Sequence, residues 1–334
     1  QSNYKKALEV YQKGLEINTV LNDRFLAAKI LGRLGAIYQI LGEYEKALKS
    51  FEEAFNISRE IGDKRGEGAY QGRLGSVCYR LGHNEEALKY HTEALRITTE
   101  IGNKRGVGVH LTNLGIIYQE LGQYKETINY LRQALRIARE IGDKAGEGNS
   151  LGILGTVYKH LGQRGESLKY VQRSLNICRE IGDKRGEGIN LGNLGDIFIS
   201  LNRLEESKKH LLEAIEICDS SMPVAGGAFR GSLALLHARQ GNIEEAEVVL
   251  EAGEPLVAVY PSEHGKFLCK KSKVYHLAKQ SKKAEKGLEQ AENIARKVNA
   301  TEGSDLGKAI AEAKAFLSEE PSPPKSSPSK DAET

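Results

Sequence analysis

Glycines spaced by one residue are the part of this sequence that most resembles a chemical site. Gly66-Glu-Gly68 and Gly146-Glu-Gly148 have the spacing of loops whose backbone N–H groups hold phosphate. Such loops follow a β-strand, and a common type ends in Gly-Lys-Ser or Gly-Lys-Thr. Here both pairs follow a helical pattern, and neither of those endings occurs in the chain. The sequence therefore does not predict nucleotide binding.

Histidines and cysteines are the other residues that could bind metal or attack a substrate. No two histidines have the HxxxH or HExxH spacing that places two ligands on one helix face, so isolated surface or groove histidines are expected. They are His83, His91, His110, His160, His210, His237, His264 and His276. The cysteines form no CxxC pair and lie in apolar helical stretches, which favours buried thiols in a reducing compartment. They are Cys78, Cys178, Cys218 and Cys269. No nucleophile motif stands near a plausible base, so the sequence predicts neither an enzyme nor a metal or cofactor site.

Lysines gather in one late segment of the chain. Eight lie between Lys266 and Lys286, where the only acidic residue is Glu285. Lys266, Lys270 and Lys273 share one helix face. This face is either a docking patch for an acidic partner or phosphate-bearing nucleic acid, or an ordinary solvated face. The net charge of +3 is too small to indicate nucleic acid by itself.

Composition indicates a soluble cytoplasmic protein. The chain has 334 residues, 40% of them hydrophobic, with no Trp and one Met, and this mixture suits helix packing. No stretch approaches the ~18 consecutive apolar residues of a membrane span. The first residues also lack the apolar run of a signal peptide.

A repeat of forty residues organises the chain. Ile61-Gly-Asp-Lys-Arg-Gly-Glu-Gly68 returns, with small changes, from Ile101, Ile141 and Ile181. Leu-Gly pairs return at the same interval, at Leu34-Gly35, Leu74-Gly75, Leu114-Gly115, Leu154-Gly155 and Leu194-Gly195. A fixed period of this size is typical of a repeat array, in which each unit buries its apolar face against its neighbours. Such an array offers a long groove and no enclosed pocket.

Each repeat predicts two helices that form a hairpin. In residues 103–141, Asn103 can accept hydrogen bonds from the start of the first helix, and Gly122 and Gly142 can end the two helices in the left-handed conformation. The glycine of each Leu-Gly pair costs roughly 1 kcal/mol of helix propensity relative to Ala. We therefore expect another helix backbone to pass close to each of these glycines.

The two ends of the chain depart from the pattern. The chain opens with a segment that matches a second helix, which suggests that it is cut from a longer protein. After Cys218 the phase slips, and two hairpins remain legible near residues 224–258 and 262–299. Ser304 then caps a last helix that ends near Leu317. The predicted organisation is a repeat array over residues 1–299 with about seven hairpins, a capping helix over 300–317, and a disordered Ser/Pro-rich tail over 318–334. The tail is either a solubilising segment or a site for proline-directed kinases at Ser322-Pro and Ser327-Pro.

The repeated residues resemble those of the tetratricopeptide (TPR) family. Leu111-x-x-Leu114-Gly115-x-x-Tyr118, then Gly122, follows that family's order of large residue, Leu-Gly, aromatic residue and Gly. The resemblance covers about nine tenths of the chain, although the family's usual period is about 34 residues. The longer repeat is similar to those of the LGN/Pins scaffold proteins and of bacterial signalling arrays. The resemblance implies an all-α, right-handed superhelical solenoid of helical hairpins with a C-terminal capping helix.

The resemblance also implies that the first helices line the concave side and receive a peptide or a partner helix. Carried over by position, the groove residues are Lys29, Arg33, Ala36, Gln39, Arg73, Ser76, Tyr79, Arg80, Thr112, Asn113, Ile116, Gln119, Glu120, Asn149, Thr156, Lys159, His160, Asn193, Asp196 and Ile199. The glycines Gly32, Gly72, Gly152 and Gly192 are expected to face the groove as well.

Departures from the family narrow this expectation. Family members that clamp a C-terminal carboxylate of a chaperone place Asn where this chain has Ala36, Ser76, Ile116, Thr156 and Asp196, so chaperone-tail binding is not predicted. Nothing in residues 300–334 resembles the G-protein-binding motifs of the spindle-orienting scaffolds.

The sequence therefore predicts an interaction scaffold for a protein or peptide with spaced apolar anchors and acidic groups that face Arg33, Arg73 and Arg80. A regulatory or sensor arm of a larger kinase or ATPase, or RNA binding through the lysines, remain alternatives. A membrane partner is not predicted, and the sequence favours a protein or peptide ligand over nucleic acid and over a small molecule.

Overall fold

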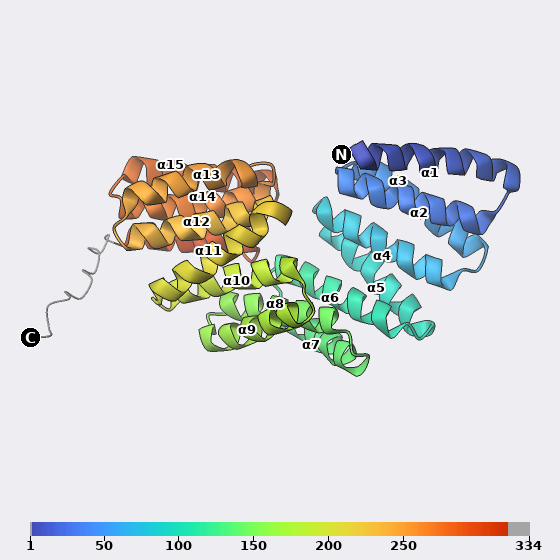
Figure 1. Cartoon of the computed structure of the whole chain (residues 1–334), viewed down its shortest axis with the longest axis horizontal. Coiled ribbons are helices and arrows are strands. Elements are labelled where there is room, and N and C mark those ends of the chain that lie inside the picture. Colours follow the sequence, from blue (N-terminus) through green and yellow to red (C-terminus); the bar gives the residue numbers. More distant parts are fainter. Residues whose placement is uncertain (1, 320–334) are drawn as a thin grey trace, which may run out of the picture. The chain divides into compact units, whose positions relative to one another are not determined.

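The computed structural model describes residues 2–319, which form helices joined by turns (Figure 1). The helices are α1 (Ser2–Leu21), α2 (Arg24–Leu41), α3 (Tyr44–Glu60), α4 (Lys64–Arg80), α5 (Asn84–Glu100), α6 (Lys104–Glu120), α7 (Tyr124–Glu140), α8 (Lys144–His160), α9 (Arg164–Glu180), α10 (Lys184–Ser200), α11 (Leu204–Ser221), α12 (Pro223–Arg239), α13 (Ile243–Val257), α14 (Pro261–Leu277), α15 (Ser281–Lys297) and α16 (Asp305–Ser318). No strand occurs in residues 2–319, which confirms the all-α prediction.

The helices belong to two compact units. Unit 1 comprises residues 1–118 and 125–146, and unit 2 comprises residues 119–124 together with the chain from Glu147 onward. Within each unit, consecutive helices pack as pairs, such as α2 with α3, α4 with α5, α10 with α11 and α12 with α13. These pairs are the predicted helical hairpins.

The predicted helix ends are present, although the side-chain bond at the start of the first helix does not form in every repeat. Asn103 Oδ1 accepts a hydrogen bond from the Gly106 N–H at 3.0 Å, and Asp183 Oδ1 accepts the equivalent bond from Gly186 at 3.0 Å. Asp63, in the same place, makes no side-chain cap bond. Gly122 and Gly142 have φ values of 74° and 68°, the left-handed conformation that glycine adopts without strain.

The glycines of the Leu-Gly pairs mark a close contact, although mainly with a side chain. A Cβ on Gly35 would meet the Phe51 ring at 2.8 Å, and a Cβ on Gly195 would meet Leu211 Cγ at 2.5 Å. In both cases the side chain comes from the second helix of the same hairpin. The expectation of a neighbouring backbone is met at Gly155, where the Val171 nitrogen would lie 3.2 Å from the added Cβ.

Serine hydroxyls show how near the two helices of a hairpin come. Ser167 Oγ donates to the Gly155 carbonyl oxygen at 2.7 Å, and Ser207 Oγ donates to the Gly195 carbonyl oxygen at 2.9 Å. Both serines are fully buried. A hydroxyl that bridges the helices in this way satisfies its own buried polar group, which would otherwise cost stability. Sequence and packing therefore select a small residue on each side of this contact.

The end of unit 2 is covered by α16. Its cap is Ser304, whose Oγ accepts from the Gly307 N–H at 3.1 Å, as predicted. Leu306, Ile310 and Ala313 are buried with apolar residues of α14 and α15, namely Leu268, Cys269 and Ala291. All four cysteines are free and buried, which confirms the prediction for the thiols. The Ser/Pro-rich tail from residue 320 onward lies outside the described residues.

No helix within residues 2–319 combines the length and the apolar character needed to cross a bilayer.

Substitution of Gly195 tests the hairpin contact. Gly195→Ala should destabilise unit 2 by about 1–3 kcal/mol, because the new methyl group overlaps Leu211 in a packed core. Gly165→Ala is the matched control, since its Cβ meets nothing within 4 Å and alanine favours a helix by up to about 1 kcal/mol. Urea unfolding followed by circular dichroism compares the two. Equal shifts of the midpoint would contradict the packing described here.

Candidate functional site

The sequence-predicted groove residues all lie on the first helix of a hairpin, and we call this surface the first-helix face. In unit 1 it comprises residues of α2, α4 and α6. In unit 2 it comprises Gln119 and Glu120 at the end of α6 and residues of α8 and α10.

Adjacent first helices lock together through a ring and a glycine. In unit 1 the Tyr70 ring of α4 fills the space beside Gly32 of α2, where a Cβ would lie 2.5 Å from the ring, and Tyr70 Oη donates to the Ala28 carbonyl oxygen at 2.8 Å. The His110 ring of α6 fills the same place beside Gly72, at 2.5 Å. The glycines expected to face a ligand are therefore covered by the next helix.

Unit 2 repeats this packing with phenylalanines. Phe229 of α12 lies against Gly192 of α10, and Phe267 of α14 lies against Gly231 of α12. Gly152 of α8 meets smaller groups, Ser174 Oγ at 3.1 Å and Asn190 Oδ1 at 3.3 Å from its ideal Cβ. Gly192 is buried beneath Phe229, so it offers no surface to a ligand, whereas Gly152 is half-buried beside Ser174 and Asn190.

In unit 1 the first-helix face carries cations that have no acidic partner. Arg33, Arg73 and Arg80 are exposed, and none of them forms an ion pair within the described residues. Lys29 lies 4.1 Å from the centre of the Phe25 ring. This face therefore presents three solvated guanidinium groups.

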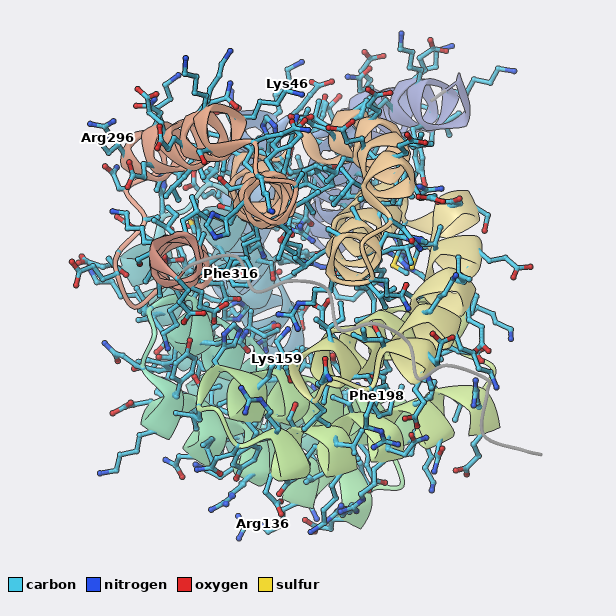
Figure 2. All side chains as sticks on the ribbon, turned by 90° about the vertical axis from the view of Figure 1, so that its left-hand side faces the viewer. Lys46, Arg136, Lys159, Phe198, Arg296 and Phe316 are labelled. Atoms are coloured by element: carbon cyan, nitrogen blue, oxygen red, sulfur yellow. The ribbon has the colours of Figure 1, made fainter. Side chains whose placement is uncertain are left out.

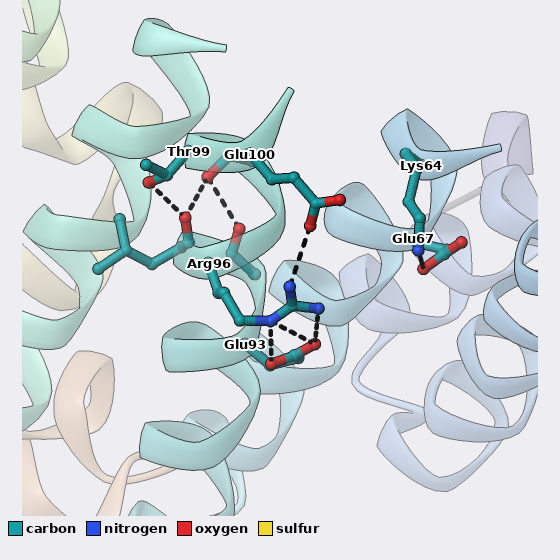
Figure 3. A network of polar contacts seen from close by, with 9 residues as sticks. Lys64, Glu67, Glu93, Arg96, Thr99 and Glu100 are labelled. Carbon is teal, nitrogen blue, oxygen red and sulfur yellow. Dashed lines mark hydrogen bonds and ion pairs between the residues drawn. The ribbon is translucent and has the colours of Figure 1, made fainter. Parts of the chain in front are cut away.

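On α5, a second helix of the same unit, the arginine is paired, as Figure 3 shows. The Arg96 guanidinium on α5 contacts Glu93 at 2.7 Å and Glu100 at 2.9 Å, and these carboxylates raise its pKa. On α5 the arginine is thus neutralised by its own helix, whereas Arg33, Arg73 and Arg80 are left for other partners.

The remaining predicted residues of unit 1 contribute less surface. Ser76 Oγ donates to the Gly72 carbonyl oxygen at 2.9 Å, and Thr112 Oγ1 donates to the Gly108 carbonyl oxygen at 2.9 Å. Thr112 is buried, so it offers almost nothing to a ligand. Four further positions are half-buried: Ala36, Gln39, Tyr79 and Asn113. Apolar surface comes from Ile40 and Val109, which are 60% and 50% exposed, and from the half-buried Ile116.

In unit 2 the first-helix face is held by a charge cluster centred on Asp196. Asp196 Oδ2 lies 3.6 Å from Lys159 Nζ and 3.8 Å from Lys270 Nζ, and Lys270 also donates to Ser232 Oγ at 2.5 Å. The four side chains come from α10, α8, α14 and α12. Figure 2 shows Lys159 among the ribbons of this unit. The cluster thereby ties four first helices together.

Burial and charge act in opposite directions within this cluster. Burial alone would raise the pKa of Asp196, but the ammonium groups of Lys270 and Lys159 outweigh it and hold that pKa below its ordinary value. Burial lowers the pKa of Lys270 in spite of Asp196. The carboxylate and its lysines therefore depend on one another for their charged states.

The other predicted residues of unit 2 fall into three classes. Ile199 is buried in the apolar core, so it is not available to a ligand. Thr156 Oγ1 donates to the Ile153 carbonyl oxygen at 2.8 Å, while Asn149 is exposed and Asn193 half-buried. Gln119, Glu120 and His160 lie where the start of α16 approaches the face.

The lysine-rich segment is not a free basic patch. Lys266 pairs with Glu263 at 2.6 Å, Lys271 with Glu254 at 2.6 Å, and Lys273 with Glu312 at 3.6 Å. Lys270 belongs to the Asp196 cluster, and Lys283 lies 3.8 Å from Glu247. The acidic partners come from outside residues 266–286. A count of charges within the segment therefore could not reveal them, and the docking-patch alternative loses its main support.

Two histidines of unit 1 form a buried pair, which the sequence did not predict. His91 and His110 are almost fully buried, and their Nδ1 atoms lie 3.4 Å apart. Burial lowers the pKa of His91 to about 3, with a further contribution from His110, and lowers that of His110 to about 4. Among the described residues no group of His, Cys, Asp and Glu has the geometry of a metal site.

Comparison with known proteins places these features in context. A family model described as tetratricopeptide repeat matches residues 26–100, 106–167 and 147–220, which is more than half of the chain. A comparison with curated protein sequences finds no match.

Several solved structures share the fold. One is a signal transduction ATPase with numerous domains (STAND) that has a tetratricopeptide repeat sensor, from Pyrococcus horikoshii; it is 23% identical, with 77% of this chain and 40% of that chain covered and a TM-score of 0.60. Another is the apo quorum sensor NprR from B. thuringiensis, 13% identical, with 95% and 99% covered and a TM-score of 0.56. A third is NprR in complex with its cognate peptide NprX, 16% identical, with 94% and 99% covered and a TM-score of 0.57.

The histidine pair should make unit 1 sensitive to acid. Because both folded-state pKa values lie below the ordinary 6.5, the stabilisation is complete above pH 6.5 and is lost as the pH falls toward 4 and 3. His91→Leu copies Leu131 of the next repeat. Between pH 6.5 and pH 5 the free energy of unfolding of this variant should fall by about 2 kcal/mol less than that of the wild type. Thermal unfolding at several pH values measures this. The exposed His83, substituted by Gln, is the control, and an equal effect of both variants would contradict the assignment.

The Asp196 cluster should be sensitive to loss of its carboxylate. Asp196→Asn leaves Lys159 and Lys270 without their shared partner, at a cost of about 3 kcal/mol. Asp219→Asn removes a more exposed carboxylate that pairs with Arg230 at 2.6 Å, and it should cost less than about 1 kcal/mol. Chemical denaturation of both variants provides the comparison. A cost for Asp196→Asn no greater than that of the control would mean that the cluster does not tie the helices together.

Proposed function

The chain belongs to the tetratricopeptide repeat family, and we propose that it is a non-enzymatic interaction scaffold that binds a peptide or helix of a partner protein on its first-helix face. A long face built from successive helices suits an elongated ligand, which can make weak contacts with several repeats at once. The NprR complex with its peptide NprX is a precedent on the same fold.

The unpaired arginines of unit 1 are the observation that carries this proposal. A guanidinium with no carboxylate partner can form bidentate hydrogen bonds to an acidic side chain of a ligand. Arg33 and Arg73 occupy the same place in successive repeats, and Arg80 is the last residue of α4, the helix that also carries Arg73. The exposed Ile40 and Val109 supply apolar surface beside them. The partner is therefore a segment with acidic groups and spaced apolar anchors.

In unit 2 the proposed site comprises Asn149, Thr156, Lys159, His160, Asn193 and Asp196. The charged groups among them are already paired within the protein, so the face of unit 2 favours a polar or uncharged ligand segment. We also propose the division into an array over 1–299, a cap over 300–317 and a tail beyond it. Four buried free thiols support a cytoplasmic location.

Reversal of two arginines tests the proposal. Arg73→Glu with Arg80→Glu should weaken the binding of partners captured by the wild-type chain by at least about tenfold, mainly by replacing attraction with repulsion. Lys49→Glu with Lys89→Glu, on α3 and α5, changes the net charge equally but lies on second helices. Affinity capture with the full chain, mass spectrometry and titration of the recovered partners give the comparison. Unchanged binding by the arginine variant, or equal losses in both variants, would rule out the first-helix face.

A second candidate is a sensor arm of a larger signalling protein. The structure from Pyrococcus horikoshii carries such a repeat sensor beside an ATPase, and this chain covers 40% of it. The resemblance of the long repeat to the LGN/Pins scaffolds supports the first candidate instead. The full-length gene separates them, because a kinase or ATPase motif in the same open reading frame favours the sensor arm and its absence favours the scaffold.

A further inference from the structure

The beginning of α16 reaches a turn that is far away in the sequence. Asp305, the first residue of α16, accepts a hydrogen bond from Gln119 Nε2 at 3.4 Å, across 186 residues of sequence. The other oxygen of Asp305 lies 3.3 Å from His160 Nε2 at the end of α8. All three residues belong to unit 2.

A cation and two stacked rings complete this contact. Lys308 Nζ lies 3.6 Å from the centre of the Tyr124 ring, within the range of a cation–π interaction. Tyr124 stacks on His160 with ring centres 5.8 Å apart and an angle of 6° between the planes. Asp305 and Lys308, one helical turn apart on α16, therefore contact the two rings of one stacked pair: Asp305 contacts His160, and Lys308 contacts Tyr124. We call the residues from Thr301 to Lys308 the cap segment.

The backbone of the cap segment also lies close to the turn that follows α6. A Cβ on Gly122 would collide with the backbone of Gly303, so only glycine fits in this turn. The Tyr124 hydroxyl is buried and has no hydrogen-bond partner within the described residues. An unsatisfied buried hydroxyl is costly, and it remains available to a ligand group that reaches the ring.

The cap segment covers part of the proposed binding face. Gln119, Glu120 and His160 are all residues of that face, and all three are half-buried. Burial raises the pKa of Glu120, and the nearby Asp305 raises it further. Burial also lowers the pKa of His160, while Asp305 acts in the opposite direction. The chain's own segment thus occupies the place that the face offers to a partner.

The geometry points to an intramolecular ligand: the cap segment occupies the first-helix face of unit 2, and an external partner that binds there replaces it. The replacing partner is a protein helix that begins with an acidic residue followed three positions later by a basic residue, as Asp305 and Lys308 do. This inference rests on the proposed function only for the identity of the face, because the contact itself stands on the distances above.

Two kinds of contact hold α16, and they divide along its length. Leu306, Ile310 and Ala313 pack in the core with α14 and α15, and the Lys314 ammonium pairs with Glu292 at 2.6 Å. The polar and aromatic contacts to Gln119, Tyr124 and His160 described above come from Asp305 and Lys308, both in the cap segment. The buried apolar residues can therefore keep the body of α16 in place when the contacts of Asp305 and Lys308 are removed. The release of the cap segment can then be tested in the full chain.

A peptide of residues 299–318, labelled with fluorescein, is the probe. It should bind weakly to the wild-type chain, whose own cap segment occupies the site, because apparent affinity falls with the fraction of free sites. The full chain with Asp305→Ala and Lys308→Ala should bind it at least about tenfold more tightly. Lys314→Ala, which breaks an ion pair elsewhere on α16, should behave as the wild type. A peptide that carries the same two alanines should not bind any of the proteins.

Hydrogen exchange gives a second measurement that needs no ligand. Amides of residues 119–124 should exchange at least about threefold faster in the double variant than in the wild type, with no change in Lys314→Ala. If the double variant fails to fold, Lys308→Ala alone, at a half-buried position, is titrated in its place. Equal affinity of the peptide for the wild type and the cap variant would overturn the proposal, and so would binding of the alanine peptide. The arginine variants of unit 1 test the proposed function separately, since the probe here requires no external partner.

Discussion

Four first helices of this protein, α4, α6, α12 and α14, are each positioned by a ring that fills the space beside a glycine of the preceding first helix. Tyr70 does so at Gly32, His110 at Gly72, Phe229 at Gly192 and Phe267 at Gly231. A ring in such a notch fixes both the distance and the register of two helices, because a packed interior tolerates neither overlap nor a void. The surface residues on either side of the notch are thereby held at set positions. The binding face depends on this contact more than on any residue that touches a ligand.

Charge divides the face between the two units. Arg33 on α2 and Arg73 and Arg80 on α4 find no carboxylate within the described residues, so water solvates them and a ligand can compete for them. On α8, α10, α12 and α14 the charges lie deeper, where an unpaired ion would be expensive, and the Asp196 cluster satisfies them internally. The same repeat thus supplies a surface for recognition in unit 1 and an internal support in unit 2. The cap segment adds to this difference, because it occupies the first-helix face of unit 2, whereas the arginines Arg33, Arg73 and Arg80 of unit 1 are exposed.

Much of the fold follows from the period of the sequence. Asn103, Gly122 and Gly142 mark helix ends by their own conformational preferences, and Ser304 marks the start of α16, so local chemistry was sufficient to predict them. The ring-and-glycine contact was missed. Tyr70 and His110 stand thirty-eight residues after Gly32 and Gly72, and the type of ring changes from repeat to repeat, which hides the pattern from a search for identical residues. A glycine followed 36 to 38 residues later by an aromatic or imidazole ring is the signal that could have found it.

The site was less predictable than the fold, for a physical reason. Helical position indicates which side of a helix a residue occupies, but it does not show what approaches from elsewhere in the chain. Thr112 and Ile199 are buried, and the acidic partners of Lys271 and Lys273 lie on α13 and α16. Asp305 meets Gln119 from 186 residues away. Such contacts depend on how successive repeats stack, and a single sequence carries no direct record of that.

A hydrogen-exchange footprint of the full chain with a bound partner tests the central claim most directly. If first helices receive the ligand, amides of α2, α4 and α6 gain protection while those of α3, α5 and α7 stay unchanged. Protection confined to the second helices, or to the turns that join them, would contradict the account.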